Sequence, residues 1–238
     1  NPSVTDYSVN SNPLGVPEAV RKSVQESADR IMHYPDVRCD RLRESISDFE
    51  RIEKEKILCG NGAAELFFAV VMAVRPKKAL VTAPAFSEYE RALGTVGAEV
   101  QYYRLKEEQD FRIQEDILEQ ITEDTDMIFL CNPNNPTGTY LPFDEVKRLH
   151  AALPADCLLV LDAAYAEYVR RNDYEAGVEL VSQFDNVVMT RTFSKIHGLA
   201  ALRLGWAYCP EHVADTLNRI RGPFNVSAPA LAAGVGAI

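Results

Sequence analysis

The chain has 238 residues and carries 25 lysines and arginines against 35 aspartates and glutamates, which gives a net charge of −10 at pH 7. Hydrophobic residues make up 47% of it and charged residues 25%, a composition that excludes an intrinsically disordered protein and is typical of a globular one. Because nucleic acids and anionic membranes attract basic surfaces, the acidic balance argues against either as the main partner.

No part of the sequence predicts a membrane span or a secretion signal. The longest apolar runs, such as residues 66–74, fall well short of the roughly 18 residues that a spanning helix needs. The five cysteines are scattered and form no CxxC pair, which favours free thiols in a reducing cytoplasm over disulfides or a zinc site. The chain begins without methionine and finishes in an apolar stretch, residues 230–238, so we expect a piece of a longer protein that lacks a C-terminal portion.

The N-terminal part of the sequence predicts an irregular segment followed by two helices. Residues 7–15 are rich in Asn, Pro and Gly, which is typical of a surface or active-site loop. Pro17 opens the first helix, because proline favours the start of a helix. The second helix has apolar residues at Leu42, Ile46 and Phe49, which share one helical face.

From residue 64 onward, helical stretches alternate with short apolar runs. The predicted strands are residues 79–82, 100–103, 127–131, 158–162, 187–190 and 204–208. The predicted helices are residues 64–74, 87–96, 114–121, 143–152 and 212–221. Several strands are apolar throughout, as expected for strands covered on both faces. The sequence therefore predicts an α/β fold with a mainly parallel sheet flanked by helices.

Ligands of open parallel sheets bind beyond the carboxyl ends of the strands. The segment Gly-Asn-Gly-Ala-Ala-Glu, residues 60–65, opens a helix whose free amide groups suit a phosphate, although taken alone it is more typical of a plain tight turn. Phe86 follows the predicted strand at residues 79–82 and can lie flat on a planar ring, but viewed alone it is more typical of a core residue.

Three further segments carry stronger signals. Residues 132–138, Asn-Pro-Asn-Asn-Pro-Thr-Gly, form a constrained polar turn that favours function over a generic loop. Asp162 ends an apolar strand, and its carboxylate needs a cationic partner, either a pyridinium N–H or a nearby Arg or Lys. Lys195 follows Ser194 and precedes small apolar residues, which favours a desolvated amine for Schiff-base chemistry over a surface lysine. Arg203, eight residues later, can clamp a phosphate.

The motifs NPNNPTG (residues 132–138), DxAY (162–165) and SKxxGLxxLRLG (194–205) are specific in this order. The series resembles the fold-type-I pyridoxal-phosphate enzymes, the class I/II aminotransferase family, and looks most like its histidinol-phosphate aminotransferases and threonine-phosphate decarboxylases. The resemblance runs from about Tyr7 to Ile238. It implies an N-terminal arm and helix over residues 1–35, a cofactor-binding large domain over 36–225 and the start of a truncated small domain over 226–238.

Carried over position by position, the resemblance implies roles around pyridoxal 5'-phosphate. Lys195 binds the cofactor covalently and later moves the Cα proton, while Asp162 keeps the pyridine nitrogen protonated. The other cofactor contacts fall to Tyr165 and Asn135 at the ring's 3-oxygen, Phe86 on the ring face, and the Ala63 and Ala64 amides with Ser194 and Arg203 at the phosphate. Asn10 matches an asparagine near the substrate. Tyr34 matches a tyrosine that reaches the phosphate of the neighbouring subunit, which implies a homodimer.

The implied reaction moves an amino group from a small-molecule donor, an amino acid or a phosphorylated amine, to a 2-oxo acid. Two alternatives stay open: a decarboxylase of the threonine-phosphate kind, and a cofactor-binding fragment without catalysis. The sequence departs from the family at Ala163, where Glu is common, and at Ala63 and Ala64, where Ser-Asp is common. It also lacks the C-terminal arginine that normally binds the substrate α-carboxylate.

Overall fold

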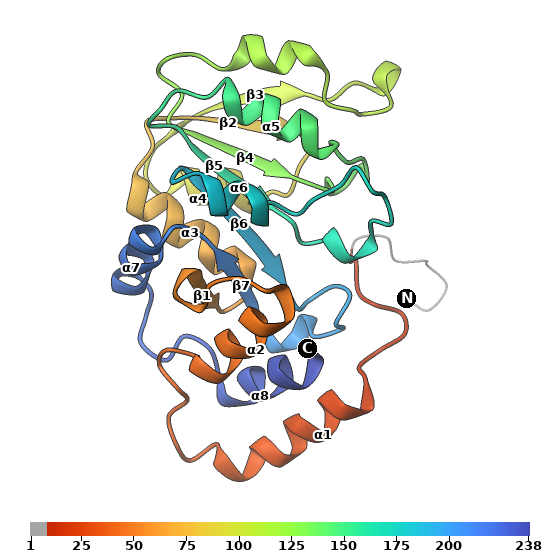
Figure 1. The fold of residues 1–238 in the computed structure, drawn as a ribbon, viewed down its shortest axis with the longest axis vertical. Coiled ribbons are helices and arrows are strands. Elements are labelled where there is room, and N and C mark those ends of the chain that lie inside the picture. The colour runs from red at the N-terminus through yellow and green to blue at the C-terminus, as the bar shows by residue number, and fades with distance from the viewer. Residues whose placement is uncertain (1–8) are drawn as a thin grey trace.

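Seven strands form one sheet in the computed structural model, which describes residues 9–238 (Figure 1). Their order across the sheet is β1-β7-β6-β5-β4-β2-β3. The strands are β1 (Ile57–Gly60), β2 (Lys78–Ala83), β3 (Glu99–Arg104), β4 (Met127–Cys131), β5 (Leu158–Asp162), β6 (Val187–Thr192) and β7 (Gly205–Tyr208). Tyr7, where the family resemblance begins, and the rest of the predicted arm before Val9 lie outside the described residues.

The direction of the strands confirms the mainly parallel sheet. Neighbours from β3 through β2, β4 and β5 to β6 are all parallel, whereas β7 runs antiparallel to both β6 and β1. A parallel pair needs a crossover, usually a helix that packs on a face of the sheet. The connection from β6 to β7 holds only the short 3₁₀ helix η6 (Ala200–Leu202), so the chain turns back on itself. This return brings residues 193–204 to the carboxyl end of β6.

The strands bury alternate side chains in two hydrophobic cores, one on each face of the sheet. In β1, for example, Leu58 belongs to one core, and Ile57 and Cys59 belong to the other. The first core is closed by α3 (Ala63–Val74), α4 (Glu88–Gly94) and α7 (Glu211–Ile220). The second is closed by α2 (Asp40–Glu50), α5 (Phe143–Ala151), α6 (Val178–Gln183) and α8 (Ala228–Ala237), with α1 (Glu18–Ser27) packed against α8 (Figure 1).

Most predicted elements end within two residues of the expected positions, but one predicted helix differs in type and three observed elements were not predicted. The helix predicted over residues 114–121 is the 3₁₀ helix η4 (Glu115–Gln120), in which only Ile117 is buried, so packing does not sustain an α-helix there. The elements β1, α6 and α8 were not predicted from the sequence. The first two are short, and α8 is apolar on all sides, so it lacks the amphipathic period of a surface helix. Within residues 9–238, no helix is long and apolar enough to cross a membrane.

The close packing of α8 gives a stability prediction. A Cβ atom added at Gly234 would lie 2.6 Å from Leu204 Cδ2 and 2.9 Å from Leu42 Cδ1. Gly234→Val should therefore lower the free energy of unfolding by about 1–3 kcal/mol through overpacking, as measured by urea unfolding. The control is Gly94→Ala in α4, where nothing lies within 4 Å of an added Cβ and stability should be unchanged or higher. Equal stability of the two variants would contradict the packing of α8.

Candidate active site

The buried carboxylate of Asp162 lies at the carboxyl end of β5, and its side chain is anchored on both oxygens. Oδ2 accepts a hydrogen bond of 2.5 Å from the Tyr89 hydroxyl, and Oδ1 accepts from the Ala164 amide at 3.1 Å and the Thr190 hydroxyl at 3.4 Å. Burial raises the pKa of this carboxyl above its ordinary value, while the hydrogen bonds and the charge of Lys195 act to lower it.

Asp162 has no cationic partner inside the described chain. Its residue is 4% exposed, and no lysine or arginine within residues 9–238 lies at ion-pair distance from it. The sequence left two partners open, a pyridinium N–H and a nearby Arg or Lys. The salt bridge to an Arg or Lys is not formed within the described residues. A buried carboxylate without a partner is costly, so the site suits a ligand that brings its own cationic N–H group.

Tyr89 is a site residue that was not predicted from the sequence. It lies in α4, is fully buried, stacks on Phe129 with ring centroids 4.9 Å apart, and meets the edge of Phe86 at 5.7 Å. Burial and the nearby Asp162 raise the pKa of Tyr89 well above its ordinary value, so its hydroxyl stays a hydrogen-bond donor. Its position three residues after Phe86 was the available signal, since that spacing places both rings on one side of a turn.

Replacing Tyr89 with phenylalanine removes the hydroxyl that bonds Asp162. The free energy of unfolding should then fall by an amount that depends on pH. Without the hydrogen bond, the folded-state pKa of Asp162 rises further above its unfolded value. The loss of unfolding free energy in Tyr89→Phe should therefore be about 1–3 kcal/mol near neutral pH. It should shrink as the pH falls through the folded-state pKa values of Asp162 in the two proteins, which lie above the ordinary value, because a protonated carboxyl no longer carries the charge that the hydrogen bond stabilises.

Urea unfolding across this pH range measures the effect. Tyr103→Phe is the control, because it removes a hydroxyl bonded to the exposed Asp116. Its cost should be smaller and should depend less on pH. A cost for Tyr89→Phe that does not change with pH would count against the link to Asp162.

Lys195 meets two residues that are distant in the sequence. Its Nζ atom donates to the Asn10 carbonyl at 3.2 Å and lies 5.4 Å from the centre of the Tyr165 ring. The Asn10 side-chain amide donates to the Tyr165 hydroxyl at 2.9 Å, and Asn12 donates to the Ile196 carbonyl at 2.7 Å. The irregular N-terminal segment, as far as it is described, is therefore bound across the loops that follow β5 and β6. The structure thus brings together Lys195, Tyr165 and Asn10.

The loop after β4 holds itself in place with two of its three asparagines. Asn132 exchanges hydrogen bonds with the Leu141 backbone at 3.0 and 2.8 Å, and Asn134 donates to the Pro84 carbonyl at 3.1 Å. The Asn134 Oδ1 atom is buried without a partner among the described residues. Asn132 and Asn134 therefore anchor the loop, whereas Asn135 forms no side-chain hydrogen bond within the described residues.

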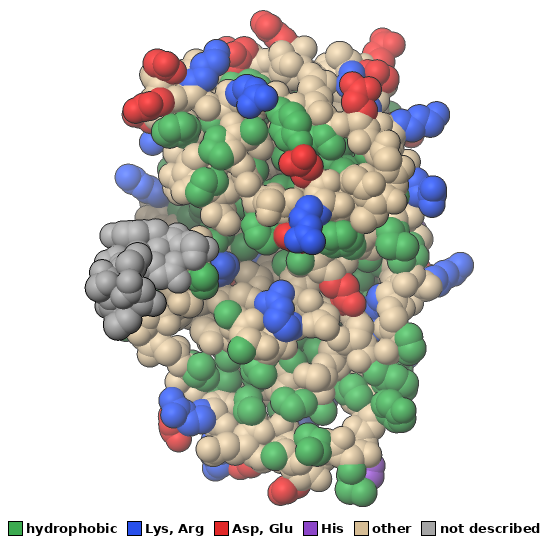
Figure 2. Space-filling model, turned by 180° about the vertical axis from the view of Figure 1, so that it is seen from behind, with side chains coloured by type: hydrophobic (Ala, Val, Ile, Leu, Met, Phe, Trp, Pro, Cys, Tyr) green, Lys and Arg blue, Asp and Glu red, His purple; other side chains and the backbone are tan. Residues whose placement is uncertain are grey.

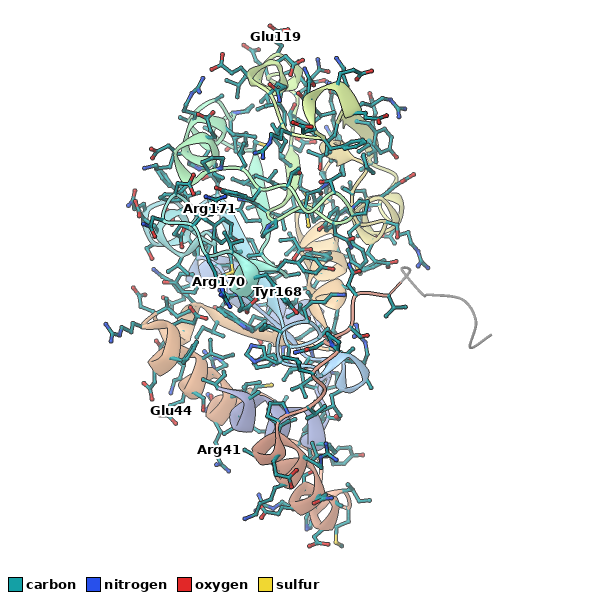
Figure 3. All side chains as sticks on the ribbon, turned by 90° about the vertical axis from the view of Figure 1, so that its right-hand side faces the viewer. Arg41, Glu44, Glu119, Tyr168, Arg170 and Arg171 are labelled. Carbon is teal, nitrogen blue, oxygen red and sulfur yellow. The ribbon has the colours of Figure 1, made fainter. Side chains whose placement is uncertain are left out.

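A hollow of about 390 Å³ opens beside this loop. It is lined by Asn135, Asn10 and Tyr165, together with Tyr168, Arg170 and Arg171, which are labelled in Figure 3. The hollow therefore joins two residues predicted at the ring's 3-oxygen to the residue predicted near the substrate.

The N-terminus of α3 forms an anion cradle with the loop after β6. Gly62, at a φ of 81°, is the N-cap, and a Cβ atom there would lie 2.4 Å from the Arg203 Nη2 atom. Arg203 also donates to the Ser194 hydroxyl at 3.4 Å. No side chain caps α3, so the Ala63 and Ala64 amides are available to a ligand. Free N–H groups, a guanidinium and a hydroxyl at one point suit a phosphate.

Tyr34 lies apart from these residues. It follows η1 (Ala28–Arg30), is 84% exposed, and stacks on Phe224 with ring centroids 4.7 Å apart. The second hollow that it lines is built from α1, α2 and α8 and contains no other predicted site residue. Within one chain, the structure therefore does not bring Tyr34 to the others.

Together, the residues at the carboxyl edge of the sheet fit a phosphorylated, cationic aromatic ring. The cradle suits its phosphate, Asp162 its ring N–H, and Lys195 a carbonyl carbon that an amine can attack. Strand β6 connects these features, because Thr190 touches Asp162 and the same strand leads into Ser194 and Lys195.

Comparisons with known proteins agree with this arrangement. Residues 2–238 match the family described as aminotransferase class I and II. A histidinol-phosphate aminotransferase of Nitrobacter hamburgensis is 46% identical over 238 residues, which cover 99% of this chain and 64% of that protein. The chain thus spans less than two thirds of the length of this relative.

Solved structures show the same fold. Histidinol-phosphate aminotransferase from Sinorhizobium meliloti in complex with pyridoxal-5'-phosphate has a TM-score of 0.90 at 25% identity, over 96% of this chain and 62% of that one. L-threonine-O-3-phosphate decarboxylase from Porphyromonas gingivalis has a TM-score of 0.85 at 27% identity, over 97% of this chain and 68% of that one. Because the family match covers nearly the whole sequence, the chain belongs to the class I and II aminotransferase family.

Proposed function

We propose that this chain binds pyridoxal 5'-phosphate and forms the cofactor-binding part of an aminotransferase similar to histidinol-phosphate aminotransferases. The observation that carries the proposal is the buried Asp162 carboxylate, which has no cationic partner in the described chain and lies at the same sheet edge as Lys195. The S. meliloti structure, which has this fold, holds the same cofactor. When bound, the cofactor supplies a ring that stores the electron pair released at the substrate Cα.

In this proposal each residue at the sheet edge has one task. Lys195 holds the cofactor covalently and moves the proton between the substrate Cα and the cofactor. Asp162 keeps the ring nitrogen protonated, and Asn10 contacts the substrate. The remaining contacts are those of Tyr165 and Asn135 with the ring's 3-oxygen, Phe86 with the ring face, and Ala63, Ala64, Ser194 and Arg203 with the phosphate.

The activity proposed is transfer of an amino group from an amino acid or phosphorylated amine to a 2-oxo acid, with histidinol phosphate as the leading donor. The 46% identity to the N. hamburgensis protein supports this choice. The test incubates the purified chain with cofactor and with histidinol phosphate, aromatic amino acids or threonine phosphate, while keto product and carbon dioxide are followed. Faster keto-product formation from histidinol phosphate than from the other donors supports the proposal. No transfer from any donor, either by this chain or by the chain joined to the C-terminal part of the N. hamburgensis protein, contradicts it.

A decarboxylase is the second candidate, because the P. gingivalis enzyme is slightly more identical in sequence than the S. meliloti aminotransferase. Carbon dioxide released from threonine phosphate, without keto product, would favour it.

A third candidate is a cofactor-binding chain without catalysis, because the chain covers 64% of its relative. The same assay on the chain joined to the C-terminal part of the N. hamburgensis protein separates this candidate from the others. Transfer by the joined chain alone would mean that the added C-terminal part supplies an essential substrate contact.

We further propose a homodimer in which Tyr34 reaches the cofactor phosphate of the partner subunit. Ile31, Met32 and Tyr34 are exposed around the end of α1, and Figure 2 shows hydrophobic side chains at the surface in the lower part of the molecule, where Figure 1 has α1 and α8. The test mixes the inactive variants Tyr34→Ala and Lys195→Ala. A shared site predicts partial recovery, because a hybrid dimer has one site with both residues intact. No recovery despite subunit exchange would contradict it.

The division into an arm and helix over residues 1–35, a large domain over 36–225 and the start of a small domain over 226–238 is part of the same proposal. So is a cytoplasmic location, which is supported by the five free, buried cysteines. The described residues also hold no group of His, Cys, Asp and Glu side chains suited to a metal ion.

A further inference from the structure

A buried ion-pair cluster joins the chain segments that carry Tyr165 and Lys195. The Arg191 side chain, on β6 and 10% exposed, pairs through Nη2 with Glu167 Oε1 at 2.8 Å and Glu50 Oε1 at 3.4 Å. Burial by itself would lower the pKa of Arg191, but the two carboxylates outweigh it and raise the pKa. The guanidinium also lies 5.6 Å from the centre of the Trp206 ring. The cluster is therefore a firmly held charge group.

Glu167 connects the two loops that carry Tyr165 and Lys195. It lies on the 3₁₀ helix η5 (Ala166–Tyr168), immediately after Tyr165, and accepts from Arg191, four residues before Lys195. On the other side of Lys195, His197 Nε2 is 3.9 Å from the same carboxylate. Among the hydrogen bonds and ion pairs of residues 9–238, those of Glu167 are the ones that join residues 164–169 to residues 191–199.

The two carboxylates on Arg191 differ in what they hold. Glu50 is the last residue of α2 and, within residues 9–238, forms no hydrogen bond or ion pair with residues 164–169. Both are similarly buried, with 20% of the Glu50 side chain and 21% of the Glu167 side chain exposed. Glu167 also keeps its Oε2 atom buried without a partner among the described residues. Burying a carboxylate oxygen without a hydrogen-bond partner costs free energy, so Glu167 points to a role beyond stabilising the fold.

We propose that Glu167 is a positioning residue that sets the Tyr165 hydroxyl relative to Lys195 through its ion pair with Arg191. This inference rests on the proposed function, because the hydroxyl is assigned there to the ring's 3-oxygen. A hydrogen bond donated to that oxygen favours its anionic form. Displacing Tyr165 should therefore raise the pH at which the absorbance band of the bound cofactor changes.

The experiment compares Glu167→Gln with Glu50→Gln and with Tyr165→Phe, after each is loaded with pyridoxal phosphate. The pH midpoint of the cofactor band should rise in Glu167→Gln by about half a unit or more, in the same direction as in Tyr165→Phe. It should stay at the wild-type value in Glu50→Gln. Glu167→Gln should also bind the cofactor more weakly than Glu50→Gln, by about tenfold. Equal midpoints in the two glutamine variants would overturn the inference.

A second measurement does not depend on the cofactor. In the unloaded chain, the Tyr168 amide donates to the Tyr165 carbonyl at 3.1 Å and the Val169 amide to the Ala166 carbonyl at 3.1 Å. Hydrogen exchange at these two amides should be faster in Glu167→Gln and unchanged in Glu50→Gln. Unchanged exchange in Glu167→Gln overturns the positioning role. If the wild-type chain takes up no cofactor, the proposed function fails, and the exchange data still judge Glu167.

Discussion

Lys195→Ala should abolish covalent retention of pyridoxal phosphate. The wild-type chain mixed with the cofactor should develop an absorbance band above that of the protein, and borohydride should fix the cofactor to the Lys195 side chain. The reason is that the Nζ atom projects beside Tyr165 at the sheet edge where Asp162 and the Arg203 cradle also lie. Without this amine the site lacks the nitrogen that would form the bond, so amino transfer should be lost as well.

Mass spectrometry of peptides from the reduced protein measures the outcome. A cofactor mass on the peptide that holds Lys195, and its absence in Lys195→Ala, is the expected result. Lys147→Ala is the control, because Lys147 is an exposed lysine paired with Asp144 and should have no effect. A tag on any other lysine in the wild-type chain would refute the assignment.

Asp162→Asn should preserve the fold and cripple the reaction. An amide can still bond to Tyr89, because a hydroxyl can accept as well as donate, and removing a buried charge avoids a desolvation cost. A neutral amide cannot, however, keep the ring nitrogen protonated by charge pairing. The rate of transfer should therefore fall by roughly a thousandfold, or about 4 kcal/mol of transition-state stabilisation in a water-poor site.

Two measurements separate these effects. Urea unfolding of the unloaded chain should show Asp162→Asn to be at least nearly as stable as the wild type. Rates of keto-product formation, measured in whichever form of the chain is active, should show the loss. The matched control is Asp173→Asn, which removes an exposed carboxylate bonded to Tyr140. Near-normal turnover in Asp162→Asn would mean that Asp162 is not the partner of the ring nitrogen.

The sequence by itself predicted the parts of the fold that depend on local pattern. Apolar runs such as those of β4 and β5 are buried along their whole length, so each pointed to a strand covered on both faces. In a parallel sheet the carboxyl ends of such strands share one edge. That geometry alone placed Asp162 and Lys195 at the same edge, and the order of the motifs indicated the family to which the chain belongs.

Elements without a distinctive period were harder to predict. The helix α8 is built from Ala, Gly, Leu, Val and one Pro, and its position in the fold depends on packing against α1 and α2 rather than on a pattern of its own. The reversal of β7 likewise depends on the connection after β6, whose length is visible in the sequence but whose path is not.

Only the tertiary structure decided which side chains meet. Tyr89 bonds Asp162 across 73 positions, Asn10 bonds Tyr165 across 155, and Glu167 holds Arg191 across 24. The separations of these pairs along the chain follow no regular period. Strand order and helix packing, and not sequence spacing, bring the paired residues together. Periodicity reports which face a residue occupies within its own element. The neighbour that it finds on another element is set by how the whole core packs, so no local pattern could reveal that Asp162 is held by a tyrosine rather than by a cation.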